Sequence, residues 1–378
     1  MTAYALVTGD FVRTGGMDVA NLALARHLAA RGEEVHLVAH RADAALLEMP
    51  GVVMHRVPKP LGSYLLGAPL LARAGQRWGR VITARGGRQV VNGGNCISTD
   101  TNWVHYVHAA HAPASAEGGS RRVVRTWAHR RFVQDERVAL RAARLVIVNS
   151  ERTRADVVQR VGVPDSRVRT VYYGTDPAVH RPPTAAERRE ARAQLGWRDD
   201  TPAVAFVGAL GDRRKGFDLV FEAWRLAARE RTWHARLVVM GAGQELPEWQ
   251  ARARREGLAD VIRFIGFTQD VRGHLWACDA VVAPSRYEAY GLAVHEAVCC
   301  GLPAITSAEA GVSERLRGLE GLQVNDLRDP GGVHAAMAVW YADREAWRRK
   351  AEECSAALRA WTWDDMSAAI VRAMQEVA

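Results

Sequence analysis

The chain has 378 residues, of which 48% are hydrophobic and 25% are charged. This length is too great for one ordinary core and suits two domains, and the composition excludes a disordered or low-complexity protein. The formal net charge of +9 is unevenly distributed, because residues 1–177 carry 24 Arg and Lys against 14 Asp and Glu, a balance of +10.

Strands and helices alternate in the first half of the sequence. The first strand, loop, helix and second strand are predicted in YALVTGD, FVRTGG, MDVANLALARHLAARG and EEVHLVAH. Further strands are predicted in VVMHRV, QVVNGG, WVHYVHAAH and ARLVIVNS. Ser150 follows the last of these and is the predicted cap of the next helix. This βαβ repetition predicts a doubly wound α/β domain over residues 1–177.

A second series of the same kind follows a break in the pattern. Turn residues and prolines between 168 and 183 indicate a domain boundary, and a helix is predicted over 184–195. Strands are then predicted in PAVAFVGAL, ARLVVMGAG, IRFIGF, DAVVAPS and PAITS. A second α/β domain is therefore expected over residues 178–360. We expect the two domains to face each other across a ligand-binding cleft.

Two glycine-containing turns are candidates for phosphate binding. Gly15 and Gly16 lie between the first strand and its helix, which suits a phosphate on backbone N–H groups, with a purely structural turn as the alternative. A G-x-G-x-x-G spacing is absent there, which disfavours a nicotinamide or flavin cofactor. In FVGALGDRRKGFDLV, Arg213, Arg214 and Lys215 follow a strand end, where cations can hold a diphosphate. The phosphate-loop pattern of NTPases is not matched.

Two carboxylates, Glu288 and Glu296, interrupt the mostly apolar, small and aromatic run SRYEAYGLAVHEAVCCGLP. A predicted strand precedes this run and a predicted helix forms its second part. Gly291 lies at the joint, which places Glu288 in the loop and Glu296 about a turn and a half into the helix. Both are expected at the carboxyl end of a strand, where open α/β sheets bind ligands. A solvated Glu that favours the helix dipole is the alternative for either residue.

The cysteines and the hydropathy pattern limit the cellular setting. The five cysteines are odd in number and have neither zinc-like nor redox spacing, which predicts buried free thiols and no structural metal. No apolar run reaches the ~18 residues of a membrane span. The first residues lack a basic region and a cleavage site, and we therefore expect a cytoplasmic protein.

Five ordered blocks of the sequence resemble a known family. They are the GG of the first loop, VNSERTRADVVQRVGVPDSRVRTVYYGTDPAVHRP, VGALGDRRKGFD, PSRYEAYGLAVHEAVCCGLPAI and the terminal TWDDMSAAI. Together they resemble the retaining GT-B glycosyltransferases of family 4, the glycosyl transferases group 1, over essentially the whole chain. The resemblance implies a Rossmann-like acceptor-binding domain over 1–177 and a Rossmann-like donor-binding domain over 178–360. It also implies a C-terminal helix, residues 361–378, that crosses back to the N-terminal domain.

The family resemblance also implies an activity and a set of site residues. A hexose would move from a nucleotide-diphosphate sugar to an acceptor hydroxyl with retention, by a same-face mechanism that needs no metal and no cofactor. Glu288 would contact the transferred sugar, and Glu296 would hold the ribose hydroxyls. Lys215, with Arg214 beside it, would bind the diphosphate. The other implied donor-binding positions are Gly15, Gly16, Phe264, Gly266, Tyr290, Gly291 and Leu292, of which the last three would use their backbone N–H groups.

One histidine completes the implied catalytic set. The segment NWVHYVHAAHAP carries His105, His108 and His111 at three-residue steps. His108 matches the histidine of the family near the sugar and the acceptor best, and a neutral His there can accept a hydrogen bond from a hydroxyl. A packed or solvated His is the alternative. Many relatives have an Arg where this chain has Ala209, so Arg213 or Arg214 is the substitute for the second phosphate cation.

The basic N-terminal half bears on the acceptor. Arg and Trp interleave in residues 71–88 and 120–131, and residues 61–78 are apolar at one end and bear Arg toward the other. These segments favour a lipid-linked or anionic acceptor and a peripheral contact with the inner membrane face, against the alternative of solvated Arg-rich faces. A sugar-nucleotide 2-epimerase and a nucleic-acid-binding protein are the other functions to weigh. No nucleic-acid-binding motif is present, and we expect no nucleic-acid partner.

Overall fold

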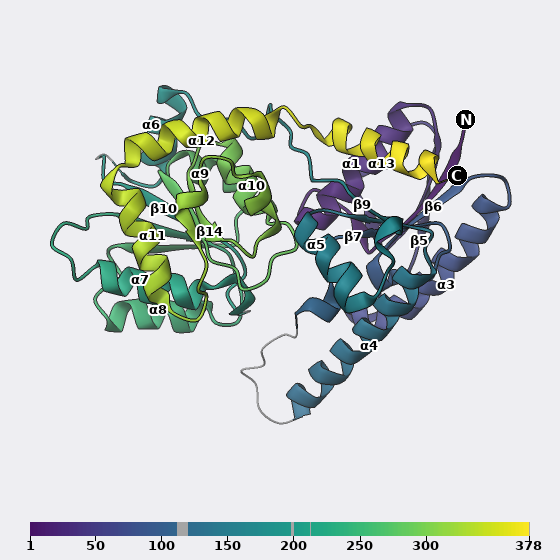
Figure 1. Cartoon of the computed structure of the whole chain (residues 1–378), viewed down its shortest axis with the longest axis horizontal. Coiled ribbons are helices and arrows are strands. Elements are labelled where there is room, and N and C mark those ends of the chain that lie inside the picture. The colour runs from purple at the N-terminus through teal and green to yellow at the C-terminus, as the bar shows by residue number, and fades with distance from the viewer. Residues whose placement is uncertain (112–119, 198–199, 212, 378) are drawn as a thin grey trace. The chain divides into compact units, whose positions relative to one another are not determined.

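The computed structural model describes residues 1–111, 120–197, 200–211 and 213–377, and it divides the chain into two compact units. Unit 1 comprises Met1–Gly174 with Trp363–Ala378, and unit 2 comprises Thr175–Thr362. Each unit is built on a parallel sheet with helices around it (Figure 1). The predicted α/β class with two such domains is confirmed. The side chains of residues 112–125, which include part of the predicted basic segment, lie outside the described set.

Unit 1 contains a seven-stranded parallel sheet in the order β5-β3-β1-β6-β7-β8-β9. The strands are β1 Ala3–Val7, β3 Glu34–Ala39, β5 Val52–Arg56, β6 Arg88–Asn92, β7 Thr101–Val104, β8 Leu145–Val148 and β9 Val168–Thr170. Two short strands, β2 Asp10–Phe11 and β4 Arg41–Ala42, pair with each other beyond the main sheet. From β1 the chain adds β3 and then β5 on one side of the sheet, and it then returns to place β6 on the other side of β1. The strand order therefore reverses beside β1, and in open α/β sheets this is where ligands bind.

The helices of unit 1 follow the predicted alternation. They are α1 Gly16–Ala30, α2 Ala44–Leu47, α3 Tyr64–Thr83, α4 Ser120–Ala142, α5 Glu151–Asp156 and α13 Trp363–Glu376. The predicted cap at Ser150 is confirmed, because its side chain accepts a hydrogen bond from the backbone N–H of Thr153 at 3.0 Å. The segment WVHYVHAAH is a strand only as far as Val104. His108 lies in a short 3-10 turn, His108–Ala110, beyond the carboxyl end of β7.

Unit 2 contains a six-stranded parallel sheet in the order β12-β11-β10-β13-β14-β15. The strands are β10 Ala203–Val207, β11 Arg236–Met240, β12 Ile262–Gly266, β13 Ala280–Ala283, β14 Ala304–Ser307 and β15 Gln323–Val324. The helices are α6 Ala185–Gln194, α7 Phe217–Ala227, α8 Leu246–Arg255, α9 Val271–Trp276, α10 Leu292–Cys299, α11 Pro330–Ala342 and α12 Arg344–Arg359. Its core contains the fully buried aromatic side chains of Phe221, Trp224 and Trp340.

Two further expectations concern the cysteines and the membrane. All five cysteines are buried and free, as predicted. Within the described residues, no helix has the length and apolar character that crossing a bilayer would require.

The terminal helix α13 belongs to unit 1, although unit 2 separates it from the rest of that unit in the sequence. It packs against α1, as Figure 1 shows. Asp364 lies 3.2 Å from His27 of α1, and Arg88 of β6 donates a hydrogen bond to the carbonyl oxygen of Met374 at 2.7 Å. The face of α13 turned to the unit buries Met366, Ile370 and Met374. The predicted return of the terminal helix to the N-terminal domain is therefore confirmed.

We predict that Ile370→Ala destabilises unit 1, because Ile370 is fully buried in the face of α13 that packs on the unit. Removing a buried aliphatic side chain of this size lowers the free energy of unfolding by about 2–5 kcal/mol. The exposed Gln375 of the same helix provides the control, Gln375→Ala, which should leave stability nearly unchanged. Denaturant unfolding followed by circular dichroism measures both. Equal stability of the two variants would contradict the packing of this helix.

Candidate active site

The loop between β13 and α10 carries the first of the two predicted carboxylates, Glu288. Two backbone hydrogen bonds hold this loop to the segment after β14: Gly311 N–H donates to the carbonyl of Glu288 at 3.1 Å, and Val312 N–H donates to that of Tyr290 at 2.7 Å. Gly291 ends the loop with a φ of +106°, which a residue with a Cβ rarely adopts. A Cβ at Gly291 would also lie 3.1 Å from a methyl group of Val312. The loop and the start of α10 are thus fixed by local geometry.

The predicted cations lie beside Glu288. Lys215 Nζ contacts Glu288 Oε2, and Arg214 Nη1 lies 3.4 Å from the same oxygen and donates to the carbonyl of Tyr287 at 3.1 Å. The Glu288 side chain is only 16% exposed. Burial disfavours its ionised form, but Lys215 and Arg214 outweigh that effect and hold the pKa of Glu288 below its ordinary value. Glu288 therefore forms one charged cluster with Lys215 and Arg214, which precede it in the sequence by 73 and 74 positions.

The turn Arg213–Lys215 is fastened to the same loop by further contacts. Arg286 N–H donates to the carbonyl of Arg214 at 2.7 Å, and the Arg286 side chain pairs with Asp218 of α7 at 2.8 and 2.9 Å. Gly216 follows the turn with a φ of +73°, and a Cβ there would collide with the carbonyl oxygen of Pro284. This close approach of two backbones brings the cations to the end of β13.

The second predicted carboxylate, Glu296, lies in a different environment. It belongs to α10, its side chain is 23% exposed, and the nearest opposing group is His180 Nε2 at 3.8 Å. Burial raises the pKa of Glu296 to about 7. Burial also lowers the pKa of His180 to about 4, so this imidazole is neutral at pH 7 and does not neutralise Glu296.

The remaining predicted donor-binding residues of unit 2 lie at carboxyl ends of its strands. Leu292 begins α10, Gly291 precedes it, and the hydroxyl of Tyr290 lies 2.8 Å from His295 Nδ1. Phe264 and Gly266 lie at the end of β12, where Gly266 has a φ of +80°. Because all strands of the sheet are parallel, the ends of β12 and β13 lie at the same edge.

The predicted residues of unit 1 lie at the corresponding edge of its own sheet. Gly15 has a φ of +89° and precedes α1, which begins at Gly16. His108 is 38% exposed, and its Nδ1 lies 3.1 Å from Oε1 of the fully buried Glu136 on α4. The sequence interpretation did not include Glu136. The spacing of the sequence could have identified it. Phe132 and Leu140 lie four residues to either side of Glu136 and place it on an otherwise apolar face of the helix.

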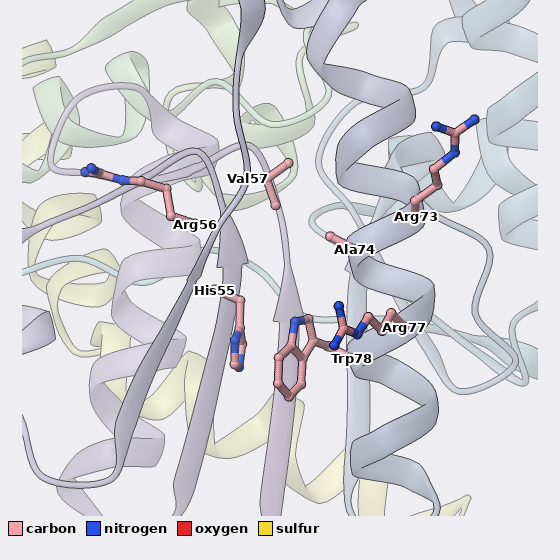
Figure 2. A pocket seen from close by; sticks show the side chains of 7 residues that line it. All are labelled: His55, Arg56, Val57, Arg73, Ala74, Arg77 and Trp78. Carbon is pink, nitrogen blue, oxygen red and sulfur yellow. The ribbon is translucent and has the colours of Figure 1, made fainter.

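Two surface hollows lie on the described part of the structure. One, with a volume of about 440 Å³, lies between β5 and α3 of unit 1 and is shown in Figure 2. The other, of about 540 Å³, includes Trp197 and Phe264 of unit 2. Neither is lined by Lys215, Glu288 or Glu296. In the described ranges, no three His, Cys, Asp or Glu side chains are gathered as a metal site would need.

Comparisons with known proteins agree with this architecture. Residues 14–179 match Glycosyltransferase Family 4, and residues 201–343 match Glycosyl transferases group 1. A relative from Geodermatophilus obscurus, named D-inositol 3-phosphate glycosyltransferase, is 30% identical over 96% of this chain and 86% of its own length. One of the same name from Mycobacterium tuberculosis is 31% identical over 84% of this chain and 69% of its own length. The chain therefore belongs to glycosyltransferase family 4 and is a glycosyltransferase.

Solved structures share the fold at lower sequence identity. WaaG, a glycosyltransferase involved in lipopolysaccharide biosynthesis, is 20% identical with a TM-score of 0.75 and covers 97% of this chain and 99% of its own. Sucrose-phosphate synthase from Thermosynechococcus elongatus is 20% identical with a TM-score of 0.76, over 100% of this chain and 99% of its own. HepE from Anabaena, solved with UDP, has a TM-score of 0.69 at 20% identity and full coverage of both chains. The fold is GT-B.

Proposed function

We propose that this glycosyltransferase transfers a hexose from a nucleotide-diphosphate sugar to an acceptor hydroxyl, with retention of configuration and without a metal ion. The observation that carries the proposal is the cluster of Glu288, Lys215 and Arg214 at the end of β13. It combines a carboxylate for a sugar with two cations for a diphosphate. HepE from Anabaena was solved with UDP-glucose, which supports a nucleotide-sugar donor for this fold. In this proposal unit 2 binds the donor, and unit 1 binds the acceptor.

The proposed reaction uses these groups in one step. The bond between the sugar C1 and the phosphate oxygen breaks, and the acceptor oxygen attacks C1 from the same face. The departing phosphate accepts the proton of the acceptor hydroxyl. Lys215, Arg214 and the backbone N–H groups of Tyr290 to Leu292 stabilise the negative charge on the phosphate. Glu288 contacts the sugar as positive charge develops at C1, and Phe264 and Gly266 support the base.

The test joins a donor panel with product analysis. UDP-, GDP-, ADP- and TDP-sugars are compared by thermal shift, since a donor at 100 times its Kd stabilises the protein by about 2.7 kcal/mol. NMR of the product from an α-linked donor should show an α-linkage, and EDTA should not slow the reaction.

Three outcomes would contradict the proposal. A β-linked product overturns retention. An isomeric sugar nucleotide formed without acceptor indicates an epimerase, and salt-dependent oligonucleotide binding without donor affinity indicates a nucleic-acid-binding protein.

For the acceptor we propose a lipid-linked or anionic molecule, such as the inositol phosphate in the names of the relatives, and contact of unit 1 with the inner membrane face. Leu61, in the turn before α3, and Leu66, in the first turn of α3, are exposed at 96% and 47%. Farther along that helix, Arg73 and Arg77 border the hollow in Figure 2, where Trp78 stacks on His55 at 3.5 Å. Exposed apolar side chains and arginines along one helical segment suit the surface of an anionic bilayer.

Vesicle co-sedimentation measures this contact. We expect the protein to bind anionic vesicles more tightly than neutral ones, and each removed charge among Arg73 and Arg77 to weaken binding about fivefold. The charge reversal Arg328→Glu, at an arginine of unit 2 that is 92% exposed, is the control and should have no such effect. Equal binding to both vesicle types would instead favour a soluble acceptor.

The two glutamates should affect different kinetic constants. Glu288→Gln removes a negative charge beside a centre that becomes cationic, so kcat should fall about 100- to 1,000-fold while donor KM changes little. Glu296→Gln weakens ribose binding in ground and transition states alike and should raise donor KM about 10- to 100-fold. Glu248→Gln, at an exposed position of α8, is the matched control. Steady-state kinetics with varied donor distinguishes the variants, and the same pattern in both would remove the separate roles.

Donor affinity should depend on pH through Glu296. Its pKa of about 7 lies above the ordinary value, so it is largely ionised at pH 8 and largely protonated at pH 6. The ionised carboxylate is the better acceptor for two ribose hydroxyls. Donor KM should therefore rise about tenfold as pH falls from 8 to 6, and the rise should be absent in Glu296→Gln. A KM that does not vary with pH in the parent enzyme would contradict this role.

A further inference from the structure

The environment of His108 is set by one buried carboxylate. Glu136 of α4 is 0% exposed and receives three hydrogen-bond contacts from the turn His108–Ala110. Its Oε1 accepts the backbone N–H of His108 at 2.8 Å and lies 3.1 Å from His108 Nδ1. Its Oε2 accepts the backbone N–H of Ala109 at 3.1 Å. Both oxygens of a side chain without solvent contact are therefore engaged by this turn.

These contacts determine which ring nitrogen of His108 carries the proton. Each oxygen of Glu136 already accepts a backbone N–H, and a carboxylate accepts hydrogen bonds but has no proton to donate. His108 Nδ1 must then be the donor to Glu136. In the neutral imidazole, Nε2 consequently keeps its lone pair and can accept a hydrogen bond.

The ring of His108 is also held by its neighbours. Phe132 of α4 lies at 5.5 Å between ring centroids, and Tyr106 lies at 5.1 Å in an edge-on arrangement. Among the described residues, the titratable groups that face the ring are Glu136 and His129 of α4, with Tyr106 on its own segment. The segment Val157–Val161 meets the turn through apolar side chains. With 38% of its surface exposed, the His108 side chain is accessible but has a fixed orientation.

We propose that Glu136 is a positioning residue for the transfer reaction: it fixes the Nδ1-protonated tautomer of His108, so that Nε2 accepts a hydrogen bond from a substrate hydroxyl. The inference rests on the proposed role of His108. The carboxylate makes no contact with substrate itself. A purely structural role for Glu136, in which it only caps the turn, would require the backbone contacts and not the imidazole contact.

Two variants separate these possibilities. Glu136→Gln keeps the size of the side chain, and its amide oxygen can still accept a backbone N–H, but its NH2 group donates to Nδ1 and forces the proton onto Nε2. His108→Asn can keep a donor near the position of Nδ1 and removes Nε2. We expect each variant to lower kcat/KM about 10- to 100-fold, by analogy with the loss of the partner that orients a metal-binding histidine. Glu136→Gln should have no additional effect in the His108→Asn background.

The matched control is Asp135→Asn, an identical carboxylate-to-amide change at the adjacent residue, which pairs with Arg131 at 2.9 Å on the helix surface. It should leave kcat/KM unchanged. Normal kinetics of His108→Asn would refute the role of His108 and so the premise. Slow His108→Asn with normal Glu136→Gln would overturn only the present inference. An equal loss from Glu136→Gln with and without His108 would assign Glu136 a structural role.

A second measurement determines the tautomer in the parent enzyme itself. In the parent enzyme labelled with 15N-histidine, the His108 signals are identified by their loss in His108→Asn. We expect the nitrogen shifts of a ring protonated at Nδ1, with Nε2 unprotonated. A ring protonated at Nε2 in the parent enzyme would overturn the proposal.

Discussion

The arrangement of unit 2 depends on the neutralisation of one poorly exposed carboxylate. Glu288 loses most of its hydration in the loop after β13, and a carboxylate in that position remains ionised only beside positive charge. Lys215 and Arg214 supply it from a turn that follows a different strand. That pairing requires the two backbones to approach closely, which explains the glycine at 216. The ion pairs of Glu288 and the close approach of the backbone at Gly216 therefore depend on each other.

The same short stretch carries a second glutamate with the opposite electrostatics. Among the described residues, Glu296 has no comparable cation beside it, and its burial raises the pKa to about 7, whereas the pKa of Glu288 is lowered. Two carboxylates eight positions apart therefore differ in protonation near neutral pH. A group that keeps its charge suits a centre where positive charge develops, and a group that exchanges its proton near neutrality suits reversible binding of hydroxyls.

In unit 1, two of the three histidines of the segment after β7 have distinct environments that their regular spacing does not show. His105 is buried, its Nδ1 lies 2.5 Å from the hydroxyl of Tyr173, and burial lowers its pKa to about 3. It is part of a polar network that includes Asn92. His108, three residues later, is exposed on one side and held on the other by Glu136. A buried histidine and an accessible histidine thus lie three residues apart in the sequence.

The sequence by itself determined the α/β class, the two sheets, the free thiols and the family, because each follows from patterns among residues close in the chain or from blocks of motif. It also selected Glu288, Lys215 and Arg214 as candidates. Only the tertiary structure brought these three together, showed that Glu136 lies against His108, and gave the two glutamates different pKa values. The physical reason is that pairing and desolvation depend on neighbours in space. The partners of Glu288 lie more than 70 residues away in sequence, and Glu136 lies 28 residues from His108, distances over which hydrophobic periodicity carries no information.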